Sequence, residues 1–414
     1  MKTNSGGCSS SASTPQVTVL QSLLKQALST VARAASTRST LPVLECVLLS
    51  QTADGLRLSA TNLELGIICQ IGARFGDASF PQDLLAAPAK TFTDLINTLP
   101  EGDVQLIFEP KTMSVQVVSG GSKSKIKGVD PKEFPPIPTA ASESAVSLTL
   151  PAEIGKIIQQ VVLATSADQS RPILTGVSLT AQATGEATSQ LTLAAADGFR
   201  MARRKVALAG AISRPVEAVI PASAMKELAR IAKDTASPIT AVVERNRVIF
   251  QTGEITLVSQ TIEGAYPNLD QIIPTRFTTR TVISTTDFLK ACKQAEIFSR
   301  TDHYTTMLEI AGEEIKIGGM SPETGATTTT LSVQSEGTPL SIAFNAVFLK
   351  QGIEALSTPT FALETNSETS PGMIRPVGET ANEFLYLAMP MHRDVIDVDE
   401  AASVAAAATT TAPA

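Results

Sequence analysis

The chain repeats itself at the length of a whole domain. In each copy, apolar residues with the i, i+3, i+4, i+7 spacing predict a first helix with one apolar face. Leu23, Ile154 and Phe288 belong to these three helices and lie 131 and 134 residues apart. The start of a second helix in each copy is marked by Pro88, Pro221 and Asn345. These starts lie 133 and 124 residues apart. The first and second helices therefore recur with nearly the same period. This period is too long for a solenoid unit and fits a whole domain, so the sequence predicts three copies of one domain.

Each copy runs helix, strands, helix, strands. The centre of the middle copy, Leu191–Arg204, alternates apolar residues, breaks at Asp197-Gly198 and then becomes basic. Asp-Gly between two such runs predicts a hairpin, because glycine accepts the positive φ of a tight turn. Val43–Ser50, Leu56–Ile71 and Ile173–Leu179 are further predicted strands. The pattern predicts an α+β fold with mostly antiparallel sheets and helices on one face.

Composition sets the expected boundaries. A four-proline stretch at Pro131–Thr139 reads as a linker, the Ser/Gly-rich start as a disordered tail, and the acidic, then Ala/Thr-rich end as another. The expected segments are a tail at 1–16, domains at 17–138, 139–275 and 276–393, and a tail at 394–414.

Several classes of protein are excluded. No run approaches the ~20 apolar residues that span a bilayer, and the start has no apolar signal region, so no membrane partner is expected. The cysteines and histidines form no CxxC pair and no metal-like spacing; they are Cys8, Cys46, Cys69, Cys292, His303 and His392. We therefore expect reduced, mostly buried thiols of a cytosolic protein, with no metal and no cofactor.

No catalytic constellation is visible. The chain has no GxSxG, GxxxxGK[ST] or HExxH motif, so nothing assembles a nucleophile, a phosphate cradle or a zinc site. The context of Asp197 indicates a turn, and His303 beside Asp302 indicates a polar loop rather than a general base. The chain is predicted not to be an enzyme, with no catalytic residues.

The charges are unevenly distributed. The chain has a net charge of −7, no Trp and 4% aromatic residues, which argues against an aromatic platform for single strands. The six predicted helices nevertheless carry eleven basic and seven acidic side chains, a net charge of +4. Either these are the ordinary solvated faces of helices, or the helices share a surface that faces a polyanion.

Five segments carry a family resemblance over about Thr18–Arg393. They are Arg38–Leu44, Arg171–Val177, Ala196–Met201, Tyr266–Leu269 and Met389–Met391. In this order, on a threefold repeat, they resemble the bacterial DNA polymerase III β sliding clamp family. The resemblance implies a ring-shaped homodimer of six similar domains, with sheets outside and helices lining the hole. Such a ring encircles duplex DNA and tethers the replicative polymerase for processivity, in the cytoplasm at the nucleoid.

The chain departs from the family pattern in three places. Phe199 stands where many members have His, His392 stands where Arg is common, and about twenty residues follow the usual end. The change at Phe199 is expected to make a partner pocket more apolar and less sensitive to pH near 6.

Sequence-independent contact with double-stranded DNA is expected from basic residues facing the hole. Arg38 and Arg171 match basic loop positions of the family, and the others follow from the charge of the helices. The full set is Lys25, Arg33, Arg38, Arg171, Lys226, Arg230, Lys233, Lys290 and Lys293.

The resemblance also implies an apolar pocket for short partner peptides. Its partners are the polymerase catalytic subunit, the clamp loader and other proteins with a clamp-binding motif. The mapped residues are Ala196, Gly198, Phe199, Arg200, Met201, Pro267, Ile272, Leu387, Met389, Pro390 and Met391. Arg200 and Arg203 are expected to form a polar rim. Alternatively, Leu385–Met391 is an edge strand packed into its own domain.

Subunit contact is expected between the first domain and the last domain of the other subunit. Ile126, Ile297 and Phe298 match the positions where the family joins its subunits, although Ile297 and Phe298 also fit an ordinary core. The competing function is a repeat scaffold that binds only proteins. Retention on circular DNA, with loss on linear DNA, separates the two.

Overall fold

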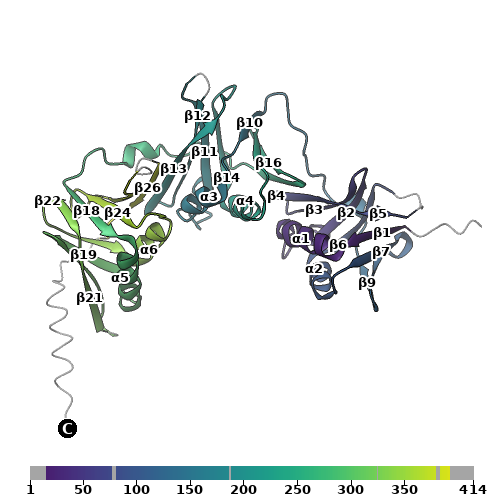
Figure 1. Cartoon of the computed structure of the whole chain (residues 1–414), viewed down its shortest axis with the longest axis horizontal. Helices are drawn as coiled ribbons and strands as arrows, with labels where there is room; N and C mark the ends of the chain where they lie inside the picture. The colour runs from purple at the N-terminus through teal and green to yellow at the C-terminus, as the bar shows by residue number, and fades with distance from the viewer. Residues whose placement is uncertain (1–14, 77–80, 186–187, 324, 379–382, 392–414) are drawn as a thin grey trace, which may run out of the picture. The chain divides into compact units, whose positions relative to one another are not determined.

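The structure is a computed structural model, and it describes residues 15–76, 81–185, 188–323, 325–378 and 383–391 (Figure 1). All six expected helices are confirmed within these ranges. They are α1 (Gln21–Val31), α2 (Ala89–Thr98), α3 (Ile154–Val162), α4 (Ala222–Asp234), α5 (Thr285–Phe298) and α6 (Ala346–Glu354).

Local signals explain where helices begin. Asn345 precedes α6, and its side chain accepts the backbone N–H groups of Val347 and Phe348. Ser284 caps α5 in the same way by accepting the N–H of Asp287. Such caps satisfy donors that have no partner inside the helix.

The described chain divides into two compact units. The first holds the described residues up to Leu150 together with Ile231–Gln260, and the second holds Pro151–Arg230 with the described residues from Thr261 onward. Every strand pair described is antiparallel, which confirms the expected α+β class.

The first unit contains two sheets. One has the order β5 (Arg74–Phe75), β1 (Gln16–Leu20), β7 (Asp103–Glu109), β8 (Ser114–Ser119), β9 (Ser122–Lys127). The other has the order β10 (Val146–Thr149), β15 (Thr240–Val243), β16 (Arg247–Thr252), β17 (Ile255–Gln260), β4 (Leu65–Ile71), β3 (Gly55–Thr61), β2 (Cys46–Thr52), β6 (Asp83–Pro88).

The second unit also contains two sheets. One has the order β14 (Val216–Pro221), β11 (Gly176–Ala183), β12 (Thr188–Ala196), β13 (Arg200–Ala209), β26 (Phe384–Ala388), β25 (Gly372–Pro376), β24 (Thr360–Thr365), β18 (Thr279–Ser284), β22 (Gln334–Gly337). The other has the order β21 (Gly325–Ser332), β20 (Glu314–Ser321), β19 (Thr305–Ala311), β23 (Leu340–Asn345).

Successive repeats share sheets. β4 of the first repeat pairs with β17 of the second, and β13 of the second pairs with β26 of the third. The middle repeat therefore contributes strands to both compact units. Helices pack on the sheets of both units: α1 packs on β3 and β4, α3 on β12 and β13, and α5 on β20 and β21, with α6 beside α5.

Three expectations need correction. The predicted strand Val43–Ser50 starts as a 3-10 turn, Pro42–Glu45, because Pro42 has no N–H for a ladder. Leu56–Ile71 is two strands, separated where the Asn62 side chain accepts two backbone N–H groups and Leu63 has a φ of 78°. Gln16 lies in β1 rather than in a tail. Pro15 is also described, and its carbonyl accepts the Phe108 N–H at 2.9 Å, whereas residues 1–14 and 394–414 of the expected tails lie outside the described ranges.

Candidate functional site

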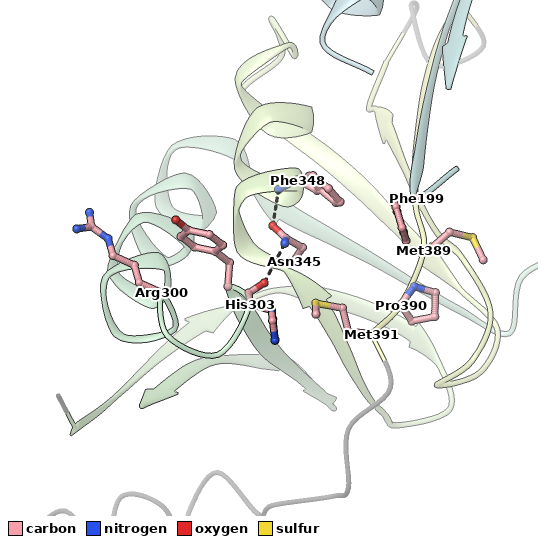
Figure 2. Close-up of a pocket in the computed structure, with 9 residues that line it drawn as sticks. Phe199, Arg300, His303, Asn345, Phe348, Met389, Pro390 and Met391 are labelled. Atoms are coloured by element: carbon pink, nitrogen blue, oxygen red, sulfur yellow. Dashed lines mark hydrogen bonds between the residues drawn. The ribbon is translucent and has the colours of Figure 1, made fainter. Parts of the chain in front are cut away.

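A hollow of about 600 Å³ opens in the second unit (Figure 2). Four chain segments meet there: the β12–β13 turn, the chain after β26, the start of α6, and the loop after α5. The lining residues are Phe199, Arg300, His303, Tyr304, Asn345, Phe348, Met389, Pro390 and Met391.

Phe199 projects from the predicted hairpin turn. Gly198 has a φ of 93°, and the Asp197 carboxylate accepts the backbone N–H groups of both Phe199 and Arg200 at 2.9 Å. The turn is therefore held by its own aspartate while the Phe199 side chain stays 65% exposed. An exposed aromatic ring on a rigid turn is suited to contact with an apolar partner.

The chain after β26 forms a second wall. The Met389 N–H donates to the Phe199 carbonyl at 2.8 Å, and the Met391 N–H donates to the Ala343 carbonyl at 2.8 Å. These bonds attach the end of the strand to the turn and to β23. In Figure 2 the Met389 side chain lies beside Phe199. Methionine is flexible and polarizable, which suits a surface that accepts different apolar groups.

The third wall joins α6 to the loop after α5. Asn345 caps α6 with its side-chain oxygen and donates its amide N–H to the His303 carbonyl at 3.0 Å. His303 and Tyr304 have φ values of 51° and 62°, a conformation uncommon for residues with a Cβ. The Ala346 N–H donates to the Tyr304 carbonyl at 2.8 Å, so the loop and helix start hold each other.

Four of the eleven residues expected in the pocket line this hollow: Phe199, Met389, Pro390 and Met391. Arg200 does not form a rim, because its side chain is 11% exposed and pairs with Asp197. Arg203 instead pairs with Asp270 at 2.5 Å. Gly198 is exposed in the turn beside the hollow.

Three further expected residues belong to a closed cluster. Ala196, Met201 and Leu387 are buried together with Met373 and Leu385. Leu269 and Ile273 pack over them, whereas Pro267 and the adjacent Ile272 are exposed. The Tyr266 hydroxyl accepts the Ala196 N–H at 3.0 Å, which ties the covering segment to β12. Burial raises the pKa of this hydroxyl to about 12, so it stays neutral at ordinary pH.

Sequence reasoning missed Arg300, His303, Tyr304, Asn345 and Phe348. Asn345 was predicted as the N-cap of a helix, and Phe348 follows three residues later at the start of that helix. No local sequence pattern indicated that either residue lies near Phe199. His303 also brings an imidazole into the lining, although the change at Phe199 was expected to make the pocket more apolar. His392 and Arg393 lie outside the described residues.

All nine expected DNA-contact residues are exposed. Lys290 pairs with Asp287 at 3.4 Å, Lys293 with Glu354 at 3.5 Å, and Arg230 lies 3.9 Å from Glu227. Exposed pairs of this kind contribute little stability, so these cations can exchange one partner for another.

The three expected subunit-contact residues differ in exposure. Ile297 is 56% exposed and Phe298 is half-buried at the end of α5. Ile126 is only 6% exposed, because on β9 its side chain points into its own domain between exposed Lys125 and Lys127. Ile126 is therefore core, and among the described strands β9 lies at the edge of its sheet.

Within the part of the chain that is described, no three His, Cys, Asp or Glu side chains are placed to hold a metal ion. Burial raises the pKa of the Cys46 and Cys69 thiols to about 11 and that of Cys292 further. Such thiols are not reactive nucleophiles. No helix in the described ranges has the length and apolarity needed to cross a membrane.

Three family models match successive parts of the chain. The N-terminal, central and C-terminal domains of the DNA polymerase III beta subunit match residues 16–138, 150–268 and 270–392.

Relatives resemble the chain along most of its length. The beta sliding clamp of Synechococcus elongatus is 30% identical, with 90% of this chain and 97% of the relative covered. That of Streptococcus pneumoniae is 28% identical over the same shares. The crystal structure of the S. pneumoniae DNA polymerase III beta chain is similar to this fold, with a TM-score of 0.83, 25% identity, and 92% and 100% of the two chains covered. The chain therefore belongs to the DNA polymerase III beta subunit family, the non-catalytic beta sliding clamps that give a DNA polymerase its processivity.

Proposed function

We propose that the chain acts as a ring-shaped homodimer that encircles duplex DNA and tethers the polymerase catalytic subunit. The same ring serves as a docking site for the clamp loader and for other proteins with a clamp-binding motif. The observation that carries this proposal is the exposure of every basic residue expected to face DNA, on a chain whose net charge is −7. We also propose a cytoplasmic, nucleoid-associated location and the three domains at 17–138, 139–275 and 276–393.

Topological retention tests the function. The protein is loaded on a nicked circular plasmid with a clamp loader and ATP, and the plasmid is then linearised. A clamp stays on the circle and slides off the ends of the linear form. A scaffold that binds only proteins is not retained on either form, and that result overturns the proposal.

DNA contact is proposed to be electrostatic and independent of sequence. Contacts with phosphates release counterions, so direct affinity falls steeply as salt rises. Replacing Lys290 and Lys293 by Glu should weaken affinity for all duplexes alike and reduce the slope of log affinity against log salt by about 2. A footprint at one preferred sequence contradicts this.

The subunit contact is proposed to join the α5 end and β21 of one subunit to β9 of the other. β21 and β9 are both edge strands, and edges carry unpaired backbone groups that can pair with another chain. Replacing Ile297 and Phe298 by Asp should yield a folded monomer in sedimentation. Leu63→Asp, at another exposed apolar residue, is the matched control and should remain a dimer.

The hollow around Phe199 is proposed as the partner-peptide site. Its aromatic rings and methionines suit apolar side chains, and Arg300 adds a cation to the lining. A variant that ends at Ala388 should form dimers and encircle DNA but fail to bind a Leu/Phe-containing clamp-binding peptide. Full affinity in this variant would place the site elsewhere.

A further inference from the structure

We propose that Arg200 is a positioning residue, which holds two walls of the hollow in place without touching the bound peptide. This inference rests on the hollow being the partner-peptide site. It concerns how that site keeps its shape before a partner arrives.

The Arg200 guanidinium joins the turn to α6. Its Nε donates to Asp197 Oδ2 at 2.9 Å, and its Nη1 donates to Gln351 Oε1. Its central carbon lies 4.4 Å from the centre of the Phe348 ring. One planar group therefore contacts a carboxylate, an amide and an aromatic face at once. Arginine can do this because its donors form a rigid planar fork that also stacks on rings.

These contacts control two walls. The Asp197 carboxylate that pairs with Arg200 also accepts the N–H of Phe199, so it fixes the turn that carries the first wall. Phe348 lies on α6 in the third wall, and the guanidinium stacks on its ring. The Phe348 backbone is anchored separately, since its carbonyl accepts the Tyr386 hydroxyl at 2.9 Å. Arg200 thus acts on the orientation of the Phe348 side chain.

Direct contact between Arg200 and a ligand is disfavoured by the same geometry. The side chain is 11% exposed, and two of its nitrogens already donate to Asp197 and Gln351. A site that already has its binding geometry does not have to order these side chains when the peptide associates, so less of the binding free energy is lost. Loss of Arg200 should therefore weaken peptide binding without removing a peptide contact.

The experiment measures binding of a fluorescent Leu/Phe-containing clamp-binding peptide to the full chain by anisotropy. Arg200→Lys keeps the charge but loses the fork, and we expect affinity to fall about tenfold. Gln351→Leu removes the acceptor on α6 and should reduce affinity about threefold. Arg204→Lys is the matched control: Arg204 lies on the same strand, is 14% exposed and pairs with Glu383 at 2.7 Å, outside the lining. It should bind like the unmodified chain.

A double-mutant cycle separates positioning from general destabilisation. Because part of the effect of Arg200 passes through the Phe348 ring, Arg200→Lys should reduce affinity by a smaller factor in a Phe348→Leu background than in the unmodified chain, and the remaining loss comes from the Asp197 turn. Additive losses, or unchanged affinity in Arg200→Lys, overturn the inference while leaving the peptide site intact. Equal losses in Arg200→Lys and Arg204→Lys, with matching drops in melting temperature, also overturn it. Failure of the unmodified chain to bind overturns the peptide site itself and this inference with it.

Discussion

The two faces of the strand pair β13–β26 pack against different parts of the second unit. Met201 and Leu387 are direct partners in the ladder and point into the closed cluster beneath Leu269 and Ile273. One residue earlier on each strand, Arg200 and Tyr386 reach α6 on the other face. Side chains alternate between the two faces of a strand. Met201 and Leu387 therefore lie in the buried cluster, whereas the neighbouring Arg200 and Tyr386 contact α6, which lines the hollow.

The difference shows which apolar surface is still available for binding. The closed cluster already gains stability from burial within the chain, so it has little apolar area left to offer a partner. Phe199, at the end of the same hairpin, keeps most of its ring in solvent. The binding surface of this hairpin therefore lies at its turn rather than along its strands.

The largest expected effect is on the closed face. Leu387→Ala empties a fully buried position, so the free energy of unfolding should fall by about 2–5 kcal/mol. Denaturant unfolding checks this, with Ile272→Ala, at an exposed isoleucine nearby, expected within about 0.5 kcal/mol of the unmodified chain. Equal effects of the two variants would remove the distinction between covered and exposed residues.

The next effect is on the open face. Phe199→Ala should leave the free energy of unfolding within about 0.5 kcal/mol and weaken binding of the clamp-binding peptide by tenfold or more, about 1.4 kcal/mol. Phe277→Ala is the control, because Phe277 is also exposed but does not line the hollow. If the Phe277 variant loses as much affinity, Phe199 has no special role.

A smaller effect is expected where the segment that covers the closed cluster is attached to β12. Tyr266→Phe removes the acceptor for the Ala196 N–H and should cost about 0.5–1.5 kcal/mol of stability near pH 7. Because the pKa of Tyr266 is raised to about 12 in the fold, its neutral form stabilises the fold below pH ~10, and this stabilisation is lost as the pH rises towards 12. The Phe variant should lack that alkaline loss in a pH series of melting curves. If the melting temperatures of the Phe variant and the unmodified chain fall equally as the pH rises towards 12, the prediction is wrong.

The smallest effect is expected from Asp270→Asn. Its carboxylate pairs with Arg203 but is mostly exposed, so the stability loss should be below about 1 kcal/mol and should shrink further in salt. Asp103→Asn, which breaks the exposed pair with Arg74, is the matched control. A large gain in peptide affinity for the Asp270 variant would show that the ion pair, rather than Leu269 and Ile273, keeps the cluster closed.

Local chemistry made much of the fold predictable. The six helices followed from apolar periodicity, the start of α6 from Asn345, and the central hairpin from Asp197-Gly198. The strands just before α2, α4 and α6, which are β6, β14 and β23, escaped prediction. The expected domain boundaries and the DNA-contact residues stay predictions.

The composition of the hollow depended on contacts that no local pattern encodes. Phe199 and Met389 were predicted together because family motifs marked both. Arg300, His303 and Phe348 meet them only after β13 pairs with β26 and α6 packs beside α5.

Sequence by itself determined the threefold repeat, the helices, the hairpin and the excess of basic residues on helices, because periodicity, caps and turn residues act over a few positions. Tertiary structure alone decided that Ile126 is core, that Arg200 is internal, and that Ile273 rather than Ile272 covers the cluster. The physical reason is that one residue of strand or turn register reverses the face of a side chain. That register is set by partners far along the chain.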